Sequence, residues 1–347
     1  MKTQLTIISH SPMSAGDPSR TVPAFLEVFR APGGRAADYN RWMSKTILCS
    51  RAFLFALALM WRQPGEAAQQ ATAALPQAQS GGASTTLIDE NVVYGNASGV
   101  VLHLDVYQPA GNGGGRPGVV LIHGGGWDSL DKSTMRGMGQ FLARFGFVAF
   151  SVDYRLLKGK ENRWPAQLDD VQRAVRWVRA NAATYGVNPE RIGAYGHSAG
   201  AQLAALLGME ETRDNSDAAL AKYSSKVQAV VDVSGPTDFT ADRNTDGAAF
   251  LENFLGAPYA SDPGVWRDAS PAFHISKDNA PFLIVHGTED ENVPIMQAQQ
   301  FYEKMQAAGV VVKFIKVNAG HTFQTPEARR QLAVETLAFF QRYLAGS

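Results

Sequence analysis

Seven short runs rich in valine, isoleucine and leucine alternate with longer stretches of helical period along most of this chain, from about Thr86 onward. The runs lie at 100–107, 118–123, 147–154, 191–198, 227–234, 281–287 and 310–317. Strands separated by helical stretches of about 10 to 15 residues are typical of crossover units, which build a mostly parallel sheet. The sequence therefore predicts an α/β fold with a mostly parallel, doubly wound sheet and flanking helices.

One of the intervening helices is predicted in more detail. It begins near Pro165, because proline suits the first turn of a helix. Four apolar residues then recur at the spacing of a single helix face, namely Leu168, Val171, Val175 and Val178. We expect this face to pack on the sheet.

The charge balance gives no sign of a polyanionic partner. Lysine and arginine together number 32, as do aspartate and glutamate, and no basic run occurs. Proteins that bind nucleic acid or anionic membranes carry a clustered basic surface. We therefore expect a small-molecule partner and no nucleic acid, while the oligomeric state stays open.

The N-terminal fifth differs from the rest of the chain. Ten unbroken apolar residues at 52–61 follow three basic residues and lead into a stretch rich in small residues. A bilayer span needs about 18 or more apolar residues, whereas a secretory signal needs about 7 to 15. We therefore predict a signal peptide over 43–73, cleaved between 67 and 73, and a secreted or periplasmic protein. The alternative is a membrane anchor or an apolar helix that stays attached.

The remaining boundaries follow from this prediction. Residues 1–42 are left unassigned, and Met43 is expected to be the true start of the chain. Cys49, the single cysteine, precedes the apolar run, so the processed protein would contain no thiol. This excludes disulfides, thiolate catalysis and cysteine metal ligands. Residues 74–347 are expected to form one domain without stable membrane association.

A serine motif lies between a predicted strand and a predicted helix. The stretch "GHSAG", Gly196 to Gly200, precedes the helical "AQLAALLG". A G-x-S-x-G in this context forms a turn so tight that the residues two before and two after the serine must lack side chains. The turn projects the serine hydroxyl outward. We therefore predict Ser198 as a nucleophile.

A serine hydroxyl needs a base to take its proton, and the base needs a third group that holds its tautomer. We predict His321 in "NAGHTF" as the base, because it lies between the last strand and the last helix. For the acid, the stretch "HGTEDENVP" offers Glu289, Asp290 and Glu291 just after a strand. We predict Asp290, and Asp238 is the main alternative.

The other histidines fit different roles. His197 points away from the serine on so tight a turn, and His103 lies within a strand. His123 and His286 occupy His-Gly turns, where the ring more often braces the loop. His274 precedes a strand in "SPAFH".

The glycine-rich stretch "HGGGW" at 123–127 follows an apolar run. Attack on a carbonyl creates an oxyanion, which backbone N–H groups stabilise well where no side chain blocks their approach. We predict such donors at Gly125, Gly126 and Ala199.

The segment at about 235–280 is longer than an ordinary crossover and is expected to form a small cap. Trp127 and Trp266, the latter from this cap, are predicted to contact the substrate.

Sequence signatures of other chemistries are missing. No G-x-G-x-x-G follows a strand, and neither G-x-x-x-x-G-K-[ST] nor H-E-x-x-H occurs. We therefore expect no cofactor and no metal.

From "LDVYQP" to "HTF" the sequence resembles bacterial esterases of the HGGG type, the hormone-sensitive-lipase-like part of the α/β-hydrolase superfamily. The similarity is strongest to the feruloyl esterase-like branch, through "LDVY", "HGGGW", "DYR", "GHSAG", "SP" and "HG-x-x-D-x-x-VP". It implies a serine carboxylic-ester hydrolase with Ser198, Asp290 and His321 as its triad. One departure is His197, where the hormone-sensitive-lipase group usually carries aspartate, and this favours the feruloyl esterase-like branch.

Three functions remain open at this point. The first is a carboxylesterase acting on short-chain or aryl esters, including acetyl and feruloyl esters. The second is an amide-cleaving relative, either an arylformamidase or a peptidase of the prolyl-oligopeptidase type. The third is a non-catalytic binding module of the same fold.

Overall fold

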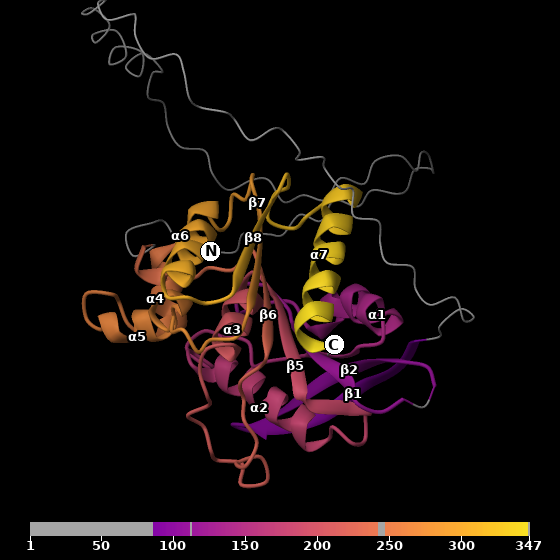
Figure 1. Ribbon diagram of the computed structural model, residues 1–347. Coiled ribbons are helices and arrows are strands. Elements are labelled where there is room, and N and C mark those ends of the chain that lie inside the picture. The colour runs from indigo at the N-terminus through magenta and orange to yellow at the C-terminus, as the bar shows by residue number, and fades with distance from the viewer. Residues whose placement is uncertain (1–85, 112, 242–246, 346–347) are drawn as a thin grey trace, which may run out of the picture. The chain divides into compact units, whose positions relative to one another are not determined.

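The computed structural model describes residues 86–111, 113–241 and 247–345 (Figure 1). The expected signal peptide, cleavage site, start residue and single cysteine all lie outside these described residues. Within them an eight-stranded sheet has the order β1-β2-β4-β3-β5-β6-β7-β8. Strands β1, β2 and β4 pair in antiparallel fashion, and the other neighbours are parallel. The predicted α/β fold with a mostly parallel sheet is confirmed.

The strands are β1 Thr86–Ala97, β2 Val100–Pro109, β3 Arg116–Ile122, β4 Val148–Val152, β5 Val187–His197, β6 Ala229–Val233, β7 Phe282–Gly287 and β8 Val312–Val317. The helices are α1 Arg136–Arg144, α2 Ala166–Ala180, α3 Ala199–Leu207, α4 Ala248–Leu255, α5 Pro263–Asp268, α6 Ile295–Ala307 and α7 Pro326–Leu344. Short 3-10 turns lie at Lys132–Met135, Phe239–Ala241 and Pro271–Phe273.

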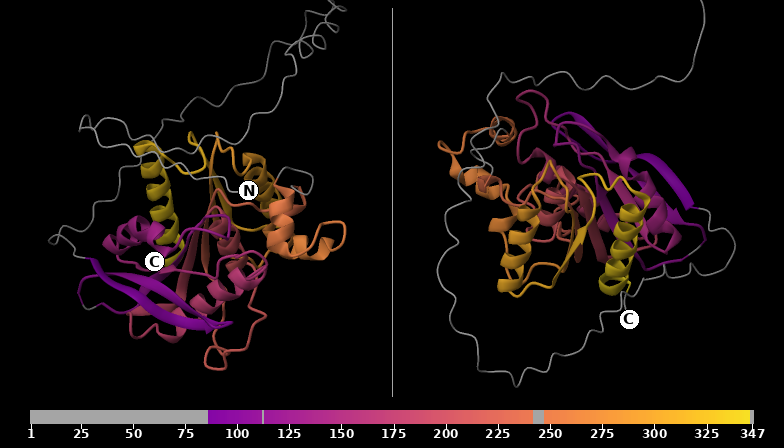
Figure 2. Two further views of the ribbon diagram at one scale, coloured as in Figure 1. Left: turned by 180° about the vertical axis from the view of Figure 1, so that it is seen from behind. Right: turned by 90° about the horizontal axis from the view of Figure 1, so that it is seen from above.

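Helices cover both faces of the sheet, as Figures 1 and 2 show. Helices α1 and α7 pack on one face, and α2, α3 and α6 pack on the other. The four apolar residues predicted to form one face of α2 are all buried there. Each face therefore has its own hydrophobic core, and the sheet lies between them.

The strand order reverses at the centre of the sheet, because β4 lies on one side of β3 and β5 lies on the other. The carboxyl ends of β3 and β5 are consequently neighbours, with Ile122 paired to Gly196. In open α/β sheets such a reversal is where ligands bind. The loops that follow these two strands carry "HGGGW" and "GHSAG".

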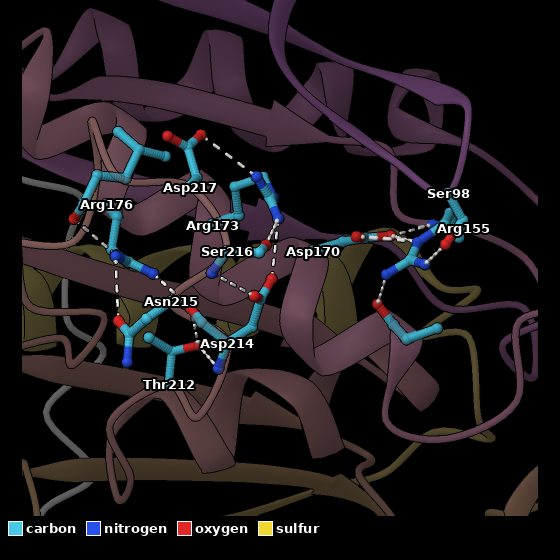
Figure 3. Close-up of polar contacts among 12 residues, drawn as sticks. Ser98, Arg155, Asp170, Arg173, Arg176, Thr212, Asp214, Asn215, Ser216 and Asp217 are labelled. Atoms are coloured by element: carbon cyan, nitrogen blue, oxygen red, sulfur yellow. Dashed lines mark hydrogen bonds and ion pairs between the residues drawn. The ribbon is translucent and has the colours of Figure 1, made fainter.

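Arginine side chains of α2 fasten the loop that follows α3, as Figure 3 shows. Arg173 forms ion pairs with Asp214 at 2.9 Å and Asp217 at 3.3 Å. Arg176 donates to the carbonyl of Asp214 at 2.8 Å. Helix α3, which begins directly after the serine turn, is thus held at its far end against α2.

Among the helices that the structure describes, none has the length and apolarity needed to cross a bilayer.

Candidate active site

Ser198 lies at the turn between β5 and α3 and has an unusual backbone conformation with a positive φ, at φ 55° and ψ −121°. A Cβ atom on Gly196 would lie 2.1 Å from the carbonyl oxygen of Gly200. A Cβ atom on Gly200 would lie 2.2 Å from the carbonyl oxygen of Ile122. Both glycines are therefore sterically required, which confirms the prediction of a turn without side chains on either side of the serine.

The side chains of Ser198, His321 and Asp290 form a continuous hydrogen-bonded chain. His321 Nε2 lies 2.8 Å from Ser198 Oγ, and His321 Nδ1 lies 2.8 Å from Asp290 Oδ2. Because a carboxylate can only accept, Nδ1 carries the hydrogen and Nε2 is left to accept from the serine hydroxyl. The structure thus brings together the three residues that the sequence singled out, from the loops after β5, β7 and β8.

Asp290 is held as a carboxylate by several donors. Its side chain is fully buried, and Oδ1 accepts the backbone N–H groups of Asn292 at 3.0 Å and Val293 at 2.9 Å. Burial alone would raise its pKa, but the hydrogen bonds from His286, His321 and Val293 outweigh that effect. The pKa of Asp290 therefore lies well below its usual range, which favours the ionised carboxylate beside His321.

The alternative acid, Asp238, lies in a separate network. Its Oδ1 accepts from the Thr240 hydroxyl at 2.6 Å, and its Oδ2 lies 3.4 Å from the Lys304 ammonium. The two neighbours of Asp290 in sequence, Glu289 and Glu291, are both exposed to solvent. Of the four candidate carboxylates, only Asp290 contacts the imidazole.

His197 supports the base from behind. Its Nε2 donates to the carbonyl oxygen of His321 at 2.9 Å, so the ring fastens the loop after β8 to the serine turn. Burial lowers the pKa of His197, which favours the neutral ring beside His321. His274 lies elsewhere, paired with Glu210 at 2.5 Å.

The glycine-rich loop after β3 is rigidly braced. The His123 ring stacks on Tyr154 at a centroid distance of 4.2 Å, and the tyrosine hydroxyl donates to the His123 carbonyl at 3.1 Å. Gly125 has a φ of 99°, and its carbonyl accepts the N–H groups of Asp128 and Ser129. These contacts fix the loop beside the serine before any ligand arrives.

The predicted oxyanion donors divide into two kinds. Gly126 and Ala199 border the cavity beside Ser198, and across the described ranges neither of their backbone N–H groups donates to a protein acceptor. Gly125 is not among the residues that line the cavity, and its carbonyl oxygen closes the turn of the loop, so its N–H group stays a predicted donor. Two N–H groups, from Gly126 and Ala199, are thus available next to the serine hydroxyl.

A cavity of about 480 Å³ opens at Ser198. Its walls come from the glycine-rich loop, the start of α3, the cap segment and the loop after Asp290. They are formed by Gly126, Trp127, Ser198, Ala199, Pro236, Phe239, Gly247, Phe250, Leu251, Asn292, Val293 and Pro294. The lining is mostly apolar and aromatic, with one amide side chain.

Trp127 lies in this wall as predicted, and its position is fixed. Its ring stacks on Phe254 at 4.3 Å between centroids, and Nε1 donates to Gln202 Oε1 at 3.0 Å. Trp266 requires a correction. It is fully buried, donates to the carbonyl of Ala257 and does not border the cavity. It packs inside the cap, because the face of α5 that carries it points to the core.

Sequence reasoning missed several lining residues. Phe239 and Leu251 border the cavity from the cap, whose apolar composition does not tell inward from outward positions. Asn292 and Val293 border it from the stretch "HGTEDENVP", which was used only to find the acid. Within the described residues no group of three or more histidine, cysteine, aspartate or glutamate side chains is arranged to hold a metal ion.

Comparison with protein families gives a match to the family model described as BD-FAE, over residues 104–305. Esterase LipQ from Mycobacterium tuberculosis is 31% identical over 252 residues, which are 70% of this chain and 59% of that protein. Esterase LipC from the same organism is 33% identical, over 62% of this chain and 55% of that protein. The chain thus spans little more than half the length of these curated relatives.

Solved structures of esterases also resemble this chain, and the similarity extends over nearly the whole of each solved chain. A truncated carbohydrate esterase from gut microbiota has a TM-score of 0.63 at 27% identity, covering 75% of this chain and 97% of that one. A thermophilic esterase from Thermogutta terrifontis, solved with propionate bound, has a TM-score of 0.63 at 28% identity, with coverages of 74% and 96%.

Proposed function

The chain belongs to the BD-FAE family of α/β-hydrolase esterases, and from this premise we propose that it is a serine carboxylic-ester hydrolase. The observation that carries the proposal is the hydrogen-bonded chain of Ser198, His321 and Asp290, which ends in a cavity beside the backbone N–H groups of Gly126 and Ala199. The relatives and structures reported above are esterases, so they do not favour an amide-cleaving activity.

The first half of the reaction acylates the serine. Ser198 Oγ attacks the ester carbonyl carbon while His321 Nε2 takes the hydroxyl proton. The carbonyl oxygen becomes an oxyanion and accepts from the N–H groups of Gly126 and Ala199. The tetrahedral species then collapses, the bond to the alkoxy group breaks, and the His321 imidazolium protonates the departing alcohol.

The second half returns the free enzyme. A water molecule enters the place of the alcohol, and His321 Nε2 takes its proton as the oxygen attacks the acyl carbon. The second tetrahedral species expels Ser198 Oγ, which regains the proton from His321, and the carboxylic acid leaves. Asp290 remains ionised throughout and stabilises the imidazolium in both halves. These steps require no cofactor.

The walls of the cavity favour small, water-soluble substrates. A volume of about 480 Å³ with Trp127, Phe239 and Phe250 in its walls suits short acyl groups and flat aryl groups. We therefore assign esters from acetyl to about hexanoyl as substrates, together with hydroxycinnamoyl esters.

Hydrolysis of p-nitrophenyl esters of increasing chain length by the purified protein tests this proposal. Turnover should peak among short chains, fall steeply beyond about eight carbons and show no activation at a lipid surface. Ser198→Ala serves as the blank. Faster cleavage of palmitoyl esters than of butyrate would mean that the enzyme is a true lipase. Cleavage of N-formylkynurenine in preference to every ester would favour an arylformamidase.

The place of action is part of the same proposal. The basic residues, apolar run and small residues at 41–73 support export to the periplasm or the medium. Esters of plant-derived sugars are substrates that an exported enzyme would meet. The processed protein would then work without a membrane anchor.

A further inference from the structure

A group of buried polar side chains lies directly behind the acid of the triad. Strands β6 and β7 are parallel neighbours, with Asp232 paired to Ile284 and Val233 to Val285. Asp232 and His286 therefore lie two positions apart on the same face of the sheet. Asp232 is 1% exposed and His286 is 0% exposed. Polar groups buried so completely in a hydrophobic sheet need a reason.

His286 reaches the carboxylate of Asp290. Its Nε2 lies 2.9 Å from the carbonyl oxygen of Val293 and 3.2 Å from Asp290 Oδ2. Both partners are acceptors, so Nε2 carries a hydrogen and donates to both. Oδ2 of Asp290 is the same oxygen that accepts from His321 Nδ1 at 2.8 Å. Two histidines thus share one carboxylate oxygen, one on the substrate side and one on the core side.

We propose that His286 is a positioning residue for the reaction, which acts through Asp290 by holding and sharing the oxygen that His321 uses. The inference rests on the proposed function for its kinetic consequences. A second donor on Oδ2 draws charge away from the bond to His321, so His286 limits how strongly the carboxylate stabilises the imidazolium. It also prevents the carboxylate from turning away from His321.

The surroundings of His286 define which other charges act on it. Asp232 shares its face of the sheet, and burial raises the pKa of Asp232 to about 6 although the charge of His286 opposes this rise. Lys316, the register partner of His286 on β8, is exposed and lies over the Phe314 ring. His197 also lies near His286, which adds to the burial that lowers the pKa of His197.

One nitrogen of His286 has no protein partner. Among the described residues, His286 Nδ1, Asp232 Oδ2 and Ser234 Oγ are all buried and make no hydrogen bond. A buried polar atom without a hydrogen bond costs free energy, so an apolar side chain would fill the position of His286 better if the ring only filled space. The polar side of the ring that does have partners is the side that meets Asp290 and Val293.

Two substitutions separate the hydrogen bond from the volume. His286→Gln keeps an N–H donor near the position of Nε2, whereas His286→Leu removes it. His274→Gln is the matched control, because His274 is a half-buried histidine that pairs with Glu210, away from the triad. The readout is the dependence of kcat/KM on pH, with kcat and KM determined separately on p-nitrophenyl butyrate.

His286→Leu should lower kcat by about 10- to 100-fold with little change in KM, because the carboxylate of Asp290 can then turn away from His321. This is the range expected when one hydrogen bond to a charged group is lost. The acid limb of its profile should move to higher pH, because Oδ2 then serves His321 alone. His286→Gln should restore most of kcat and the wild-type limb. If His286→Leu and His286→Gln lose the same amount of kcat, and the acid limb of the pH profile does not move in either variant, the proposal is overturned. A purely structural role of His286 predicts that result.

A second measurement needs neither ester hydrolysis nor folding of the leucine variant. In nitrogen-15 histidine spectra, Asp290→Asn should shift the Nε2 signal of His286 and leave that of His274 unchanged. Unchanged His286 signals would overturn the proposal. If the wild-type protein hydrolyses no ester but the His286 signal shifts in Asp290→Asn, the proposed function fails and the contact between His286 and Asp290 stands.

Discussion

At the residue scale, the site depends on how each polar side chain is held. Ser198 was predictable from its motif, and His321 from its place after the last strand. For the acid the sequence offered four carboxylates and favoured Asp290, and only its backbone and histidine donors distinguish it from the other three. The burial of Trp266 could not be predicted, because the cap sequence does not specify which aromatic ring faces the core.

The assignment of the acid is tested by a matched pair of substitutions. Asp290→Asn should lower kcat by about 10³- to 10⁴-fold, because the amide no longer fixes the tautomer of His321 or stabilises its cation. Asp238→Asn should stay within about threefold of the wild type, since Asp238 contacts Thr240 and Lys304 instead. Steady-state kinetics on p-nitrophenyl butyrate decide the matter. A crippled Asp238 variant beside an active Asp290 variant would reverse the assignment.

Asp232 gives a prediction about stability and pH. Burial raises its pKa from 3.8 to about 6 in the folded protein. As pH rises, the unfolded chain therefore releases this proton first, and the contribution of Asp232 to the stability of the wild type falls between about pH 4 and pH 6. Asp232→Asn keeps an acceptor for Gly235 N–H and has no such loss.

Urea unfolding of both proteins at pH 4 and pH 7 measures this effect. The stability of Asp232→Asn relative to the wild type should improve by about 3 kcal/mol between the two pH values, following 1.4 kcal/mol per pKa unit. A difference that stays constant across this range would show that Asp232 ionises as freely in the fold as in water.

At the element scale, two loops from neighbouring strands create the site. The loop after β3 supplies an N–H group, and the turn after β5 supplies the serine and the second N–H group. Seven strands were predictable because each lies in a short run rich in apolar residues. Strand β1 was not, because it is an edge strand whose apolar residues are interrupted by Asp89, Glu90 and Asn91, and its pairing with β2 is irregular there.

The tightness of the serine turn is tested by adding one methyl group. Gly200→Ala would place a Cβ atom 2.2 Å from the carbonyl oxygen of Ile122, so it should destabilise the fold by about 3 kcal/mol and abolish activity. Gly137→Ala, in open space within α1, should instead stabilise by about 0.5 to 1 kcal/mol. Thermal unfolding compares the two. Full activity in Gly200→Ala would mean that the turn is looser than its geometry indicates.

At the scale of the whole molecule, the sheet topology brings three distant segments together. The serine, the acid and the base follow β5, β7 and β8, and all three strands end at the same edge of the parallel part of the sheet. This arrangement could be predicted from the alternating pattern, because the carboxyl ends of parallel strands share one edge. The exact contacts behind that edge, such as those of His286, could not.

Processing of the N-terminal segment is also a whole-molecule prediction. In a bacterium with a working export system, the processed protein should begin between Ala68 and Ala74, because the apolar run at 52–61 and the small residues after it suit a signal peptidase. Intact mass of the periplasmic or secreted fraction measures this. An active cytoplasmic product that retains Trp61 would contradict it.

The central claim is that Ser198 is the nucleophile of an esterase. Incubation with a fluorophosphonate, followed by intact mass and peptide mapping, tests it most directly. We predict one adduct per chain, located on the peptide that contains Ser198, with hydrolysis of p-nitrophenyl butyrate lost in proportion and no adduct on Ser198→Ala. An unlabelled Ser198 in protein that still hydrolyses the ester, or an adduct elsewhere that accounts for the lost activity, would contradict the claim.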